Sequence, residues 1–349
     1  MSTNNKKIVF IGPMAKGRGL VGGDVVKNFY IVKYLSSYCP SLVVIDTNKL
    51  RKSKIEIIKS VYYVLRNIRS SFIISTAPPG AYTIFRLFRY LPIKNMIYWV
   101  IGGSFANHIR NKKYPASLYK KLSFIIVEGK SMQNVLEQYD FKNVITLPNF
   151  KKIEYIPKKN WERKDTQICK FVFLSRISPL KGCDYIVEAA KILNQRGLEK
   201  SYTIDFFGKI DVDYQSSFEE SLRSFSHIRH NGFLDLRVND NYDELAKYDV
   251  MLFPTYLPGE GFAGILIDGF IAGLPIIATK WNLNADIVED GKTGTIVPVH
   301  HVEALADAME RYINNPQMIV EQGKNAQSMA MKYDMDALLT SSFFKSINL

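Results

Sequence analysis

Short apolar runs rich in β-branched and aromatic residues alternate along the whole chain with longer stretches in which apolar residues recur every three or four positions. The short runs predict strands, and the longer stretches predict helices. The twelve expected strands lie at residues 7–12, 41–46, 71–76, 95–102, 123–129, 144–148, 169–175, 202–208, 228–234, 249–254, 274–279 and 294–299. Strand–helix alternation predicts parallel sheets. Because the pattern runs twice, we expect an α/β protein with two Rossmann-like, doubly wound domains that face each other across a cleft.

The join between the domains is expected in the polar, basic segment NFKKIEYIPKKNWERKDTQ, which separates two apolar strands. A chain of 349 residues is also longer than one hydrophobic core usually supports. We therefore predict an N-terminal domain at residues 1–155 and a C-terminal domain at residues 156–332. A last helix, at about residues 333–349, is expected to pack back on the first domain.

The composition is that of a soluble globular protein, with 47% hydrophobic and 23% charged residues. The N-terminal apolar run is too short for a signal peptide, and no stretch approaches the roughly 18 apolar residues of a membrane span. The three cysteines are far apart and have no C-x-x-C spacing. They predict reduced thiols rather than a disulfide framework or a zinc site. We expect a cytoplasmic protein.

The formal net charge of +13 is unevenly distributed along the chain. Residues 1–155 carry 25 Lys and Arg against 7 Asp and Glu, a net charge of +18, whereas the remainder has a net charge of −5. This asymmetry indicates that the first half faces an anionic partner. A nucleic-acid binder is disfavoured, because the sharpest motifs lie in the acidic half and no recognised binding module is present.

The segment GPMAKGRGLVGGD, which follows the first strand, contains a literal G-x-G-x-x-G at Gly17, Gly19 and Gly22. Asp46 closes the next strand, where a dinucleotide fingerprint places its ribose-binding acid. That fingerprint begins directly at the end of the strand, whereas here the first periodic helical stretch starts only near Gly23. We therefore disfavour an NAD-dependent dehydrogenase. Gly22 and Gly23, just before a helix, would instead let backbone N–H groups approach a phosphate.

Residues 254–279 read PTYLPGEGFAGILIDGFIAGLPIIAT and predict a loop followed by a buried helix from about Ala263 to Ala272. Asp268 lies inside this apolar helix, where a carboxylate is costly unless it is hydrogen-bonded. The vicinal diol of a ribose would be a suitable partner. Glu260, ahead of the helix, could accept hydrogen bonds from sugar hydroxyls, and the free N–H groups of residues 261–265 would point at a phosphate.

This stretch resembles the signature of the retaining family-4 glycosyltransferases, which have the GT-B fold and two acids separated by seven residues. Glu260 matches the first acid and Asp268 the second, where the family most often has Glu. The segment FVFLSRISPLKGCDYIVEAAKIL resembles a second family pattern, in which an Arg and a Lys clamp the donor diphosphate. The resemblance assigns this role to Arg176 and Lys181, since fixed cations stabilise the charge that develops on a leaving diphosphate.

The resemblance is dense over residues 170–300 and thin over residues 1–150, the acceptor side. It implies catalytic roles for Glu260, Arg176 and Lys181. The residues that it assigns to donor binding are Gly22, Gly23, Gly232, Phe233, Gly261, Phe262, Ala263, Gly264, Ile265 and Asp268.

Many family members have a catalytic histidine after the fourth strand, where this chain has Gly102, Gly103 and Ser104. His108, a few residues on, is a candidate substitute, and backbone N–H groups of the two glycines are the other candidates for this role. The alternative is a solvent-facing histidine on a helix.

The resemblance implies a metal-independent hexosyltransferase that needs no cofactor and retains the configuration of the anomeric carbon. The literal D-x-D at residues 211–213 is expected in a surface turn. The donor is expected to be a nucleotide-diphosphate sugar, with a UDP-sugar favoured, and the acceptor a glycan or a lipid-linked saccharide, in surface polysaccharide biosynthesis. The alternatives are a GT-B sugar-nucleotide epimerase, which would release a free sugar, and the dehydrogenase disfavoured above.

Two segments of the first half, residues 52–71 and 82–95, interleave basic with apolar side chains. Helices of this kind can lie on an anionic lipid surface, as a lipid-linked acceptor at the inner face of the cytoplasmic membrane would require. The alternative is a pair of ordinary core helices with solvated basic faces.

Overall fold

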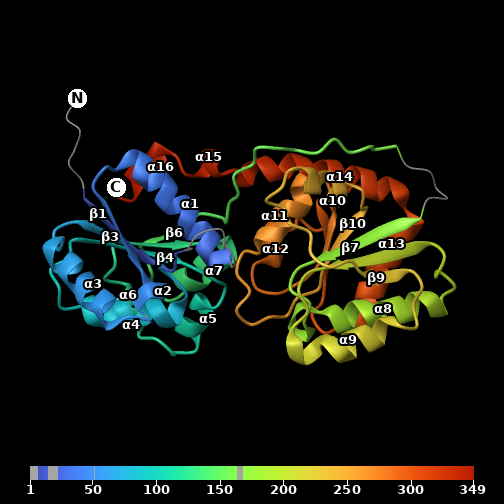
Figure 1. Ribbon diagram of the computed structural model, residues 1–349, viewed down its shortest axis with the longest axis horizontal. Coiled ribbons are helices and arrows are strands. Elements are labelled where there is room, and N and C mark those ends of the chain that lie inside the picture. Colours follow the sequence, from blue (N-terminus) through green and yellow to red (C-terminus); the bar gives the residue numbers. More distant parts are fainter. Residues whose placement is uncertain (1–6, 15–22, 51, 163–167) are drawn as a thin grey trace. The chain divides into compact units, whose positions relative to one another are not determined.

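The computed structural model describes residues 7–14, 23–50, 52–162 and 168–349. The chain divides into two compact units, each with its own sheet and core (Figure 1). Unit 1 comprises Met1–Phe150 together with Met335–Leu349, and unit 2 comprises Lys151–Asp334.

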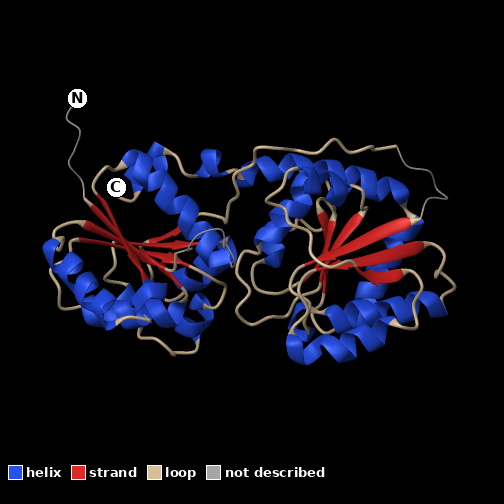
Figure 2. Cartoon of the chain, viewed as in Figure 1, coloured by secondary structure: helices blue, strands red, loops and turns tan. Residues whose placement is uncertain are grey.

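Unit 1 is built on a parallel six-stranded sheet with the order β2-β1-β3-β4-β5-β6. Its strands are β1 (Ile8–Gly12), β2 (Leu42–Asp46), β3 (Ser71–Thr76), β4 (Asn95–Val100), β5 (Phe124–Val127) and β6 (Val144–Thr146). The central strands read as continuous apolar runs because helices cover both faces of the sheet (Figure 2).

The helices of unit 1 are α1 (Gly23–Tyr38), α2 (Thr47–Leu50), α3 (Lys54–Arg66), α4 (Pro78–Phe88), α5 (Phe105–Arg110), α6 (Ala116–Tyr119), α7 (Lys130–Glu137), α15 (Met335–Leu338) and α16 (Ser341–Ser346). Helices α1 and α16 lie on one face of the sheet, and α3 and α4 lie on the other (Figure 1). The C-terminal segment packs into unit 1, where the ring of Phe344 stacks on Tyr34 with the ring centroids 5.0 Å apart.

Unit 2 has a second parallel sheet with the order β12-β11-β10-β7-β8-β9. Its strands are β7 (Cys169–Leu174), β8 (Tyr202–Phe207), β9 (Ile228–His230), β10 (Val250–Phe253), β11 (Ile276–Thr279) and β12 (Gly294–Val297). Its helices are η1 (Pro179–Lys181), α8 (Cys183–Gln195), η2 (Val212–Tyr214), α9 (Gln215–Leu222), α10 (Asp240–Ala246), α11 (Gly264–Ile271), α12 (Asn284–Ile287), α13 (Val302–Asn314), α14 (Pro316–Ala330) and η3 (Met331–Tyr333).

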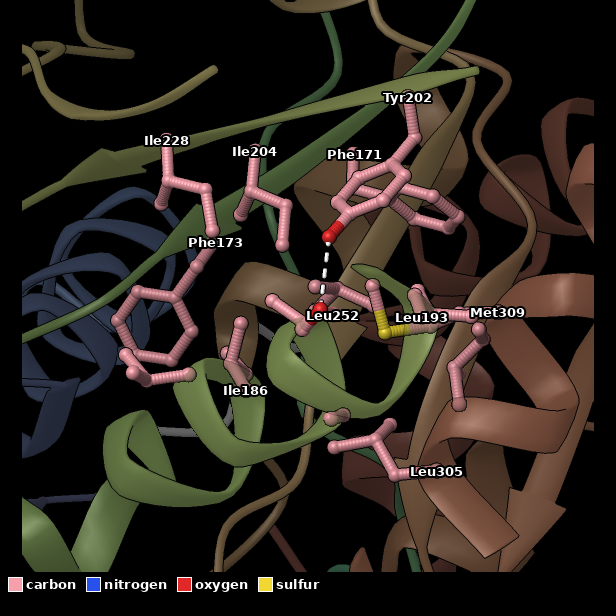
Figure 3. Packing of buried hydrophobic residues seen from close by; sticks show 14 of the residues in the cluster. Phe171, Phe173, Ile186, Leu193, Tyr202, Ile204, Ile228, Leu252, Leu305 and Met309 are labelled. Carbon is pink, nitrogen blue, oxygen red and sulfur yellow. Dashed lines mark hydrogen bonds between the residues drawn. The ribbon is translucent and has the colours of Figure 1, made fainter. Parts of the chain in front are cut away.

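The main core of unit 2 lies between the sheet and helices α8 and α13 (Figure 3). Phe171 of β7 and Ile204 of β8 face Leu193 of α8, and all three side chains are fully buried. The buried phenol of Tyr202 donates a hydrogen bond of 3.0 Å to the carbonyl oxygen of Ala190. This contact satisfies a polar group that would otherwise be costly in an apolar core.

The predicted fold class is confirmed: each unit is a doubly wound α/β domain, and all twelve predicted strands are present. The ninth strand is shorter than predicted. It ends at His230 because Gly232 adopts a left-handed conformation with φ of 75°.

Candidate functional site

Strands β7 and β10 are neighbours in the sheet of unit 2, but the chain leaves them in opposite directions. It passes from β7 to β8 on one side and from β10 to β11 on the other. The carboxyl ends of β7 and β10 therefore form a topological switch point, which is where open α/β sheets bind ligands. The two segments that carry Arg176, Lys181 and Glu260 begin at this point.

Lys181 and Glu260 form a buried ion pair between these two loops. The ammonium group of Lys181 donates to Glu260 Oε2, and the side chains are only 9% and 11% exposed. The hydroxyl of Thr255 donates to the same oxygen at 3.1 Å, and the amide of Asn282 donates to the Glu260 carbonyl at 3.0 Å. The Lys181 ammonium also lies 5.5 Å from the centre of the Phe253 ring. Both charges are therefore held in fixed positions at the carboxyl edge of the sheet.

Gly182 explains how the two loops come so close. It has φ of 79°, and a Cβ atom at this position would lie 2.2 Å from the carbonyl oxygen of Pro254. This close approach of backbone to backbone lets Tyr256 N–H donate to the Leu180 carbonyl at 3.0 Å. Glycine at position 182 is thus a condition for placing Lys181 against Glu260.

Arg176 lies two residues beyond β7, and its side chain is largely exposed. Its Nε atom is 3.7 Å from Oδ1 of Asp211, the first residue of the literal D-x-D sequence. Asp211 comes directly before η2, and its backbone N–H donates to Ile177 O at 3.0 Å. The guanidinium of Arg176 therefore remains accessible to a ligand at this edge.

Gly232 and Phe233 follow β9 at the same edge of the sheet. Gly232 accepts a 2.7 Å hydrogen bond from the backbone N–H of Gly208, which follows β8. A Cβ atom on Gly208 would lie 1.8 Å from the carbonyl oxygen of Ser175, so the segments after β7 and β8 are in direct backbone contact. Phe233 is exposed next to these glycines. The segments after β7, β8 and β9 thus form one continuous border.

Asp268 lies in the middle of α11 with its side chain only 3% exposed. The phenol of Tyr242 donates to its Oδ1 at 2.5 Å, and the ammonium of Lys151 donates to both carboxylate oxygens. Sequence reasoning missed both partners. The only signal was that Lys151 stands in the basic linker, and nothing marked Tyr242.

The loop from Gly261 to Ala263 leads into α11, and Gly264 and Ile265 form its first turn. Phe262 is buried and packs edge-on against Tyr333, with ring centroids 5.3 Å apart. Its side chain therefore anchors the loop, so a contact with a ligand would come from its backbone. The first N–H groups of α11 have no partner within the helix, as at every helix N-terminus.

The predicted site residues of unit 1 are placed only in part. Gly22 lies outside the described residues, whereas Gly23 begins α1 and has open space where a Cβ would stand. His108 lies on α5 and is half-buried, with its ring edge-on to Tyr114 at 5.1 Å. Burial, together with the nearby Lys113, lowers the pKa of His108 below its usual value. His108 thus lies on a helix, as predicted, and its ring is partly covered.

Unit 1 also contains a buried ion pair that sequence reasoning missed. Lys27 of α1 donates to Glu128 Oε1 at 2.7 Å, and the two side chains are 2% and 5% exposed. Glu128 directly follows β5, and the Lys27 ammonium lies 5.9 Å from the centre of the Trp99 ring. A lysine among the apolar positions of a predicted helix was the available signal.

Comparison with known proteins identifies the family. The family model described as glycosyl transferases group 1 matches residues 153–329. Poly(ribitol-phosphate) alpha-N-acetylglucosaminyltransferase of Staphylococcus aureus (strain COL) is 23% identical over 233 residues, which cover 66% of this chain and 45% of that protein. The capsular polysaccharide biosynthesis glycosyltransferase CapM of Staphylococcus aureus is 26% identical over 155 residues, which cover 44% of this chain and 39% of that protein. The aligned part thus spans less than half the length of either relative.

Two solved structures share the fold. The crystal structure of TarM superposes with a TM-score of 0.65 at 20% identity, over 84% of this chain and 58% of that one. The Anabaena protein HepE, crystallised in complex with UDP, superposes with a TM-score of 0.72 at 16% identity, over 98% of this chain and all of that one. At this level of sequence identity, the structural similarity establishes the fold, which is the two-domain GT-B architecture.

Proposed function

The chain belongs to the glycosyl transferases group 1 family, and from that membership we propose that it is a retaining, metal-independent glycosyltransferase. It moves a hexose-type sugar from a UDP-sugar to a glycan or lipid-linked saccharide in surface polysaccharide biosynthesis. The names of the S. aureus relatives, which refer to poly(ribitol phosphate) and to capsular polysaccharide, support this acceptor class. The UDP complex of HepE supports the donor.

The observation that carries the proposal is the buried Lys181–Glu260 pair at the switch point of unit 2. Lys181 and the exposed Arg176 bind the donor diphosphate and stabilise the negative charge that grows on it in the transition state. Glu260 accepts a hydrogen bond from a hydroxyl of the transferred sugar, through the carboxylate oxygen that Lys181 does not use. The pair thereby fixes the sugar relative to its leaving group.

The reaction breaks the bond between the anomeric carbon and the diphosphate oxygen and forms a bond from the same carbon to the acceptor oxygen. The acceptor hydroxyl attacks on the face from which the diphosphate departs, so the configuration is retained. Its proton passes to the departing phosphate oxygen. This route needs no general base from the protein, and Glu260, held in its ion pair with Lys181, is not required to act as one.

The remaining donor contacts come from backbone and from Asp268. N–H groups of Gly261 to Ile265 bind phosphate at the start of α11. Backbone groups of Gly232 and Phe233 bind the nucleobase. Lys151 and Tyr242 use three of the roughly four acceptor directions of the Asp268 carboxylate. Asp268 therefore accepts from a single ribose hydroxyl.

In unit 1, which serves the acceptor, Gly22 and Gly23 contribute N–H groups to the donor phosphates, and His108 contacts the transferred sugar. The enzyme works in the cytoplasm, at the inner face of the membrane. Its acceptor-side domain corresponds to unit 1, and its nucleotide-sugar-binding domain corresponds to unit 2, which begins at Lys151.

A thermal-shift panel of UDP-, GDP- and ADP-sugars, with NAD as the control, tests the donor. We expect a UDP-sugar to raise the melting temperature and NAD to leave it unchanged. NMR of the product then reports the anomeric configuration, which should equal that of the donor. Stabilisation by NAD would indicate a dehydrogenase, and release of a free altered sugar without acceptor would indicate an epimerase. Either result contradicts the proposal.

A further inference from the structure

Helix α3 of unit 1 turns its large apolar side chains away from the protein. Ile55, Ile58, Tyr62 and Leu65 are 54–70% exposed. Their spacing of three and four residues places them on one side of the helix. Monomeric soluble proteins rarely expose a continuous apolar surface of this kind.

The side of α3 that faces unit 1 buries little apolar surface. Glu56 and Ser60 are half-buried there, and Val64 is the buried apolar residue of the helix. Most apolar side chains of α3 are therefore exposed, together with its basic side chains. The alternative of an ordinary core helix is wrong for α3, because packing against unit 1 does not account for its apolar residues.

Exposed apolar residues also lie at the end of α4. Leu87 is 68% exposed, and Tyr90, just beyond the helix, is 76% exposed. Helices α3 and α4 lie on the same face of the sheet (Figure 1). Helix α3 leads into β3 and α4 leads into β4, and these two strands are adjacent in the sheet. The amide of Asn95, the first residue of β4, donates to the hydroxyl of Ser71, the first residue of β3, at 3.0 Å. We call six of the exposed apolar residues of this region the apolar stripe: Ile55, Ile58, Tyr62, Leu65, Leu87 and Tyr90.

Cations border the apolar stripe. Residues 47–94 contain ten lysines and arginines and one acidic residue, Glu56, which pairs with Lys59 at 3.4 Å. Arg66 donates to the Tyr62 hydroxyl at 2.7 Å. The guanidinium of Arg89 lies 4.4 Å from the centre of the Tyr90 ring. Two arginines thus contact tyrosines of the stripe.

An occupant of this surface must supply both an apolar phase and negative charge. A second copy of the chain would set cations against cations, and a nucleic acid would leave the aliphatic residues in water. A bilayer with anionic headgroups meets both requirements. Among the described helices, none combines the length and the hydropathy needed to cross a bilayer.

We propose that α3 and the end of α4 dock in the plane of an anionic membrane, with the apolar stripe at the boundary of headgroups and acyl chains and the cations among the headgroups. Tyrosines are favoured at this depth because each has an apolar ring and a polar tip. The inference adds a membrane partner to the proposed function. It rests on that function in one respect, namely that a lipid-linked acceptor would lie at this surface.

Vesicle flotation of the full chain tests the inference. One set of vesicles contains phosphatidylcholine alone, and the other also contains phosphatidylglycerol. We expect binding to the anionic vesicles only, weakened by high salt. Ile58→Glu should lower the bound-to-free ratio about tenfold or more. It removes an aliphatic group that the bilayer would bury, and it adds a charge that the headgroups repel. Val238→Glu, an exposed apolar residue of unit 2, is the matched control and should float like the parent protein.

Circular dichroism and the melting temperature should be unchanged in both variants, because both side chains are exposed. The inference is overturned if the parent protein does not float, or if Ile58→Glu binds as well as the parent. It is also overturned if sedimentation shows a dimer that Ile58→Glu dissociates, since the face would then belong to a second copy. Donor binding without vesicles is measured in parallel. Its absence in a protein that floats would defeat the proposed function and leave the membrane surface standing.

Discussion

The ammonium group of Lys181 and the carboxylate of Glu260, 79 residues apart in the sequence, share one buried hydrogen bond at the carboxyl ends of two neighbouring strands. Each of the two charges compensates the other, so that removing one leaves the other buried without its counter-ion. The pair therefore belongs to the structure of unit 2 as well as to the proposed chemistry, and the two roles can be separated by experiment.

Lys181→Met should lower kcat/KM about 100-fold or more, because it removes a cation from the developing diphosphate charge. It should also cost about 3 kcal/mol of unfolding free energy, because the Glu260 charge is left buried without a partner. Adding Glu260→Gln should restore most of the stability and none of the activity. Urea unfolding and steady-state kinetics of both single variants and the double variant measure this. Full activity in the double variant would exclude a catalytic role for the pair.

Asp268→Asn should weaken UDP binding about tenfold, since it replaces a charged acceptor of one ribose hydroxyl by a neutral one. The same change should reduce the difference in affinity between UDP and its 2′-deoxy or 3′-deoxy analogue. Asp243→Asn is the matched control, because Asp243 also accepts from a tyrosine, Tyr155, at 2.7 Å. Titration calorimetry with the three nucleotides provides the measurement. Equal affinities of parent and Asp268→Asn would mean that Asp268 serves only Lys151 and Tyr242.

The sequence predicted the features that depend on local order. All twelve strands followed from runs of apolar residues, and the spacing of Glu260 and Asp268 placed one acid before α11 and the other within it. Lys181 and Glu260 could be assigned to one edge because parallel strands present their carboxyl ends together.

The partners of Asp268 and the exposed apolar residues of α3 could not be predicted in the same way. Lys151 is 117 residues from Asp268, and a lysine that reaches a buried acid has the same local pattern as one in solvent. In α3, the hydrophobic period fixes the helix but not which side faces the protein. That side is decided by the surface available on the sheet, which no local pattern records.

Gly182→Ala should disrupt the site, whereas Gly197→Ala should not. Both glycines have a left-handed φ, 79° and 78°, so alanine carries a similar backbone strain of about 1 kcal/mol at either position. A methyl group at 182 meets the Pro254 carbonyl at 2.2 Å, but nothing lies within 4 Å at 197. We expect Gly182→Ala to lose activity and to lose more unfolding free energy than Gly197→Ala does. Steady-state kinetics and urea unfolding measure the two effects. Equal losses in the two variants would refute a role for loop contact.

Acid should destabilise unit 2 through His227. Burial lowers the pKa of this histidine below its ordinary value of 6.5, and Glu199 opposes the shift to a smaller extent. Its ring lies edge-on to Tyr202, with ring centroids 4.8 Å apart. The unfolded chain thus binds the proton more readily than the native protein. The contribution of neutral His227 is fully present above about pH 6.5 and is lost as the pH falls through the lower native pKa.

Replacing His227 by phenylalanine, which keeps the ring contacts and cannot be protonated, should reduce the loss of unfolding free energy between about pH 7 and pH 5. Replacing the exposed His301 by asparagine is the control, because it leaves the surroundings of His227 unchanged. Urea unfolding at several pH values, followed by a fluorescence signal from unit 2, provides the measurement. The prediction is contradicted if the parent and the His227→Phe variant lose the same unfolding free energy on acidification. The acid sensitivity would then come from other groups, such as His108, whose pKa is lowered in the same direction.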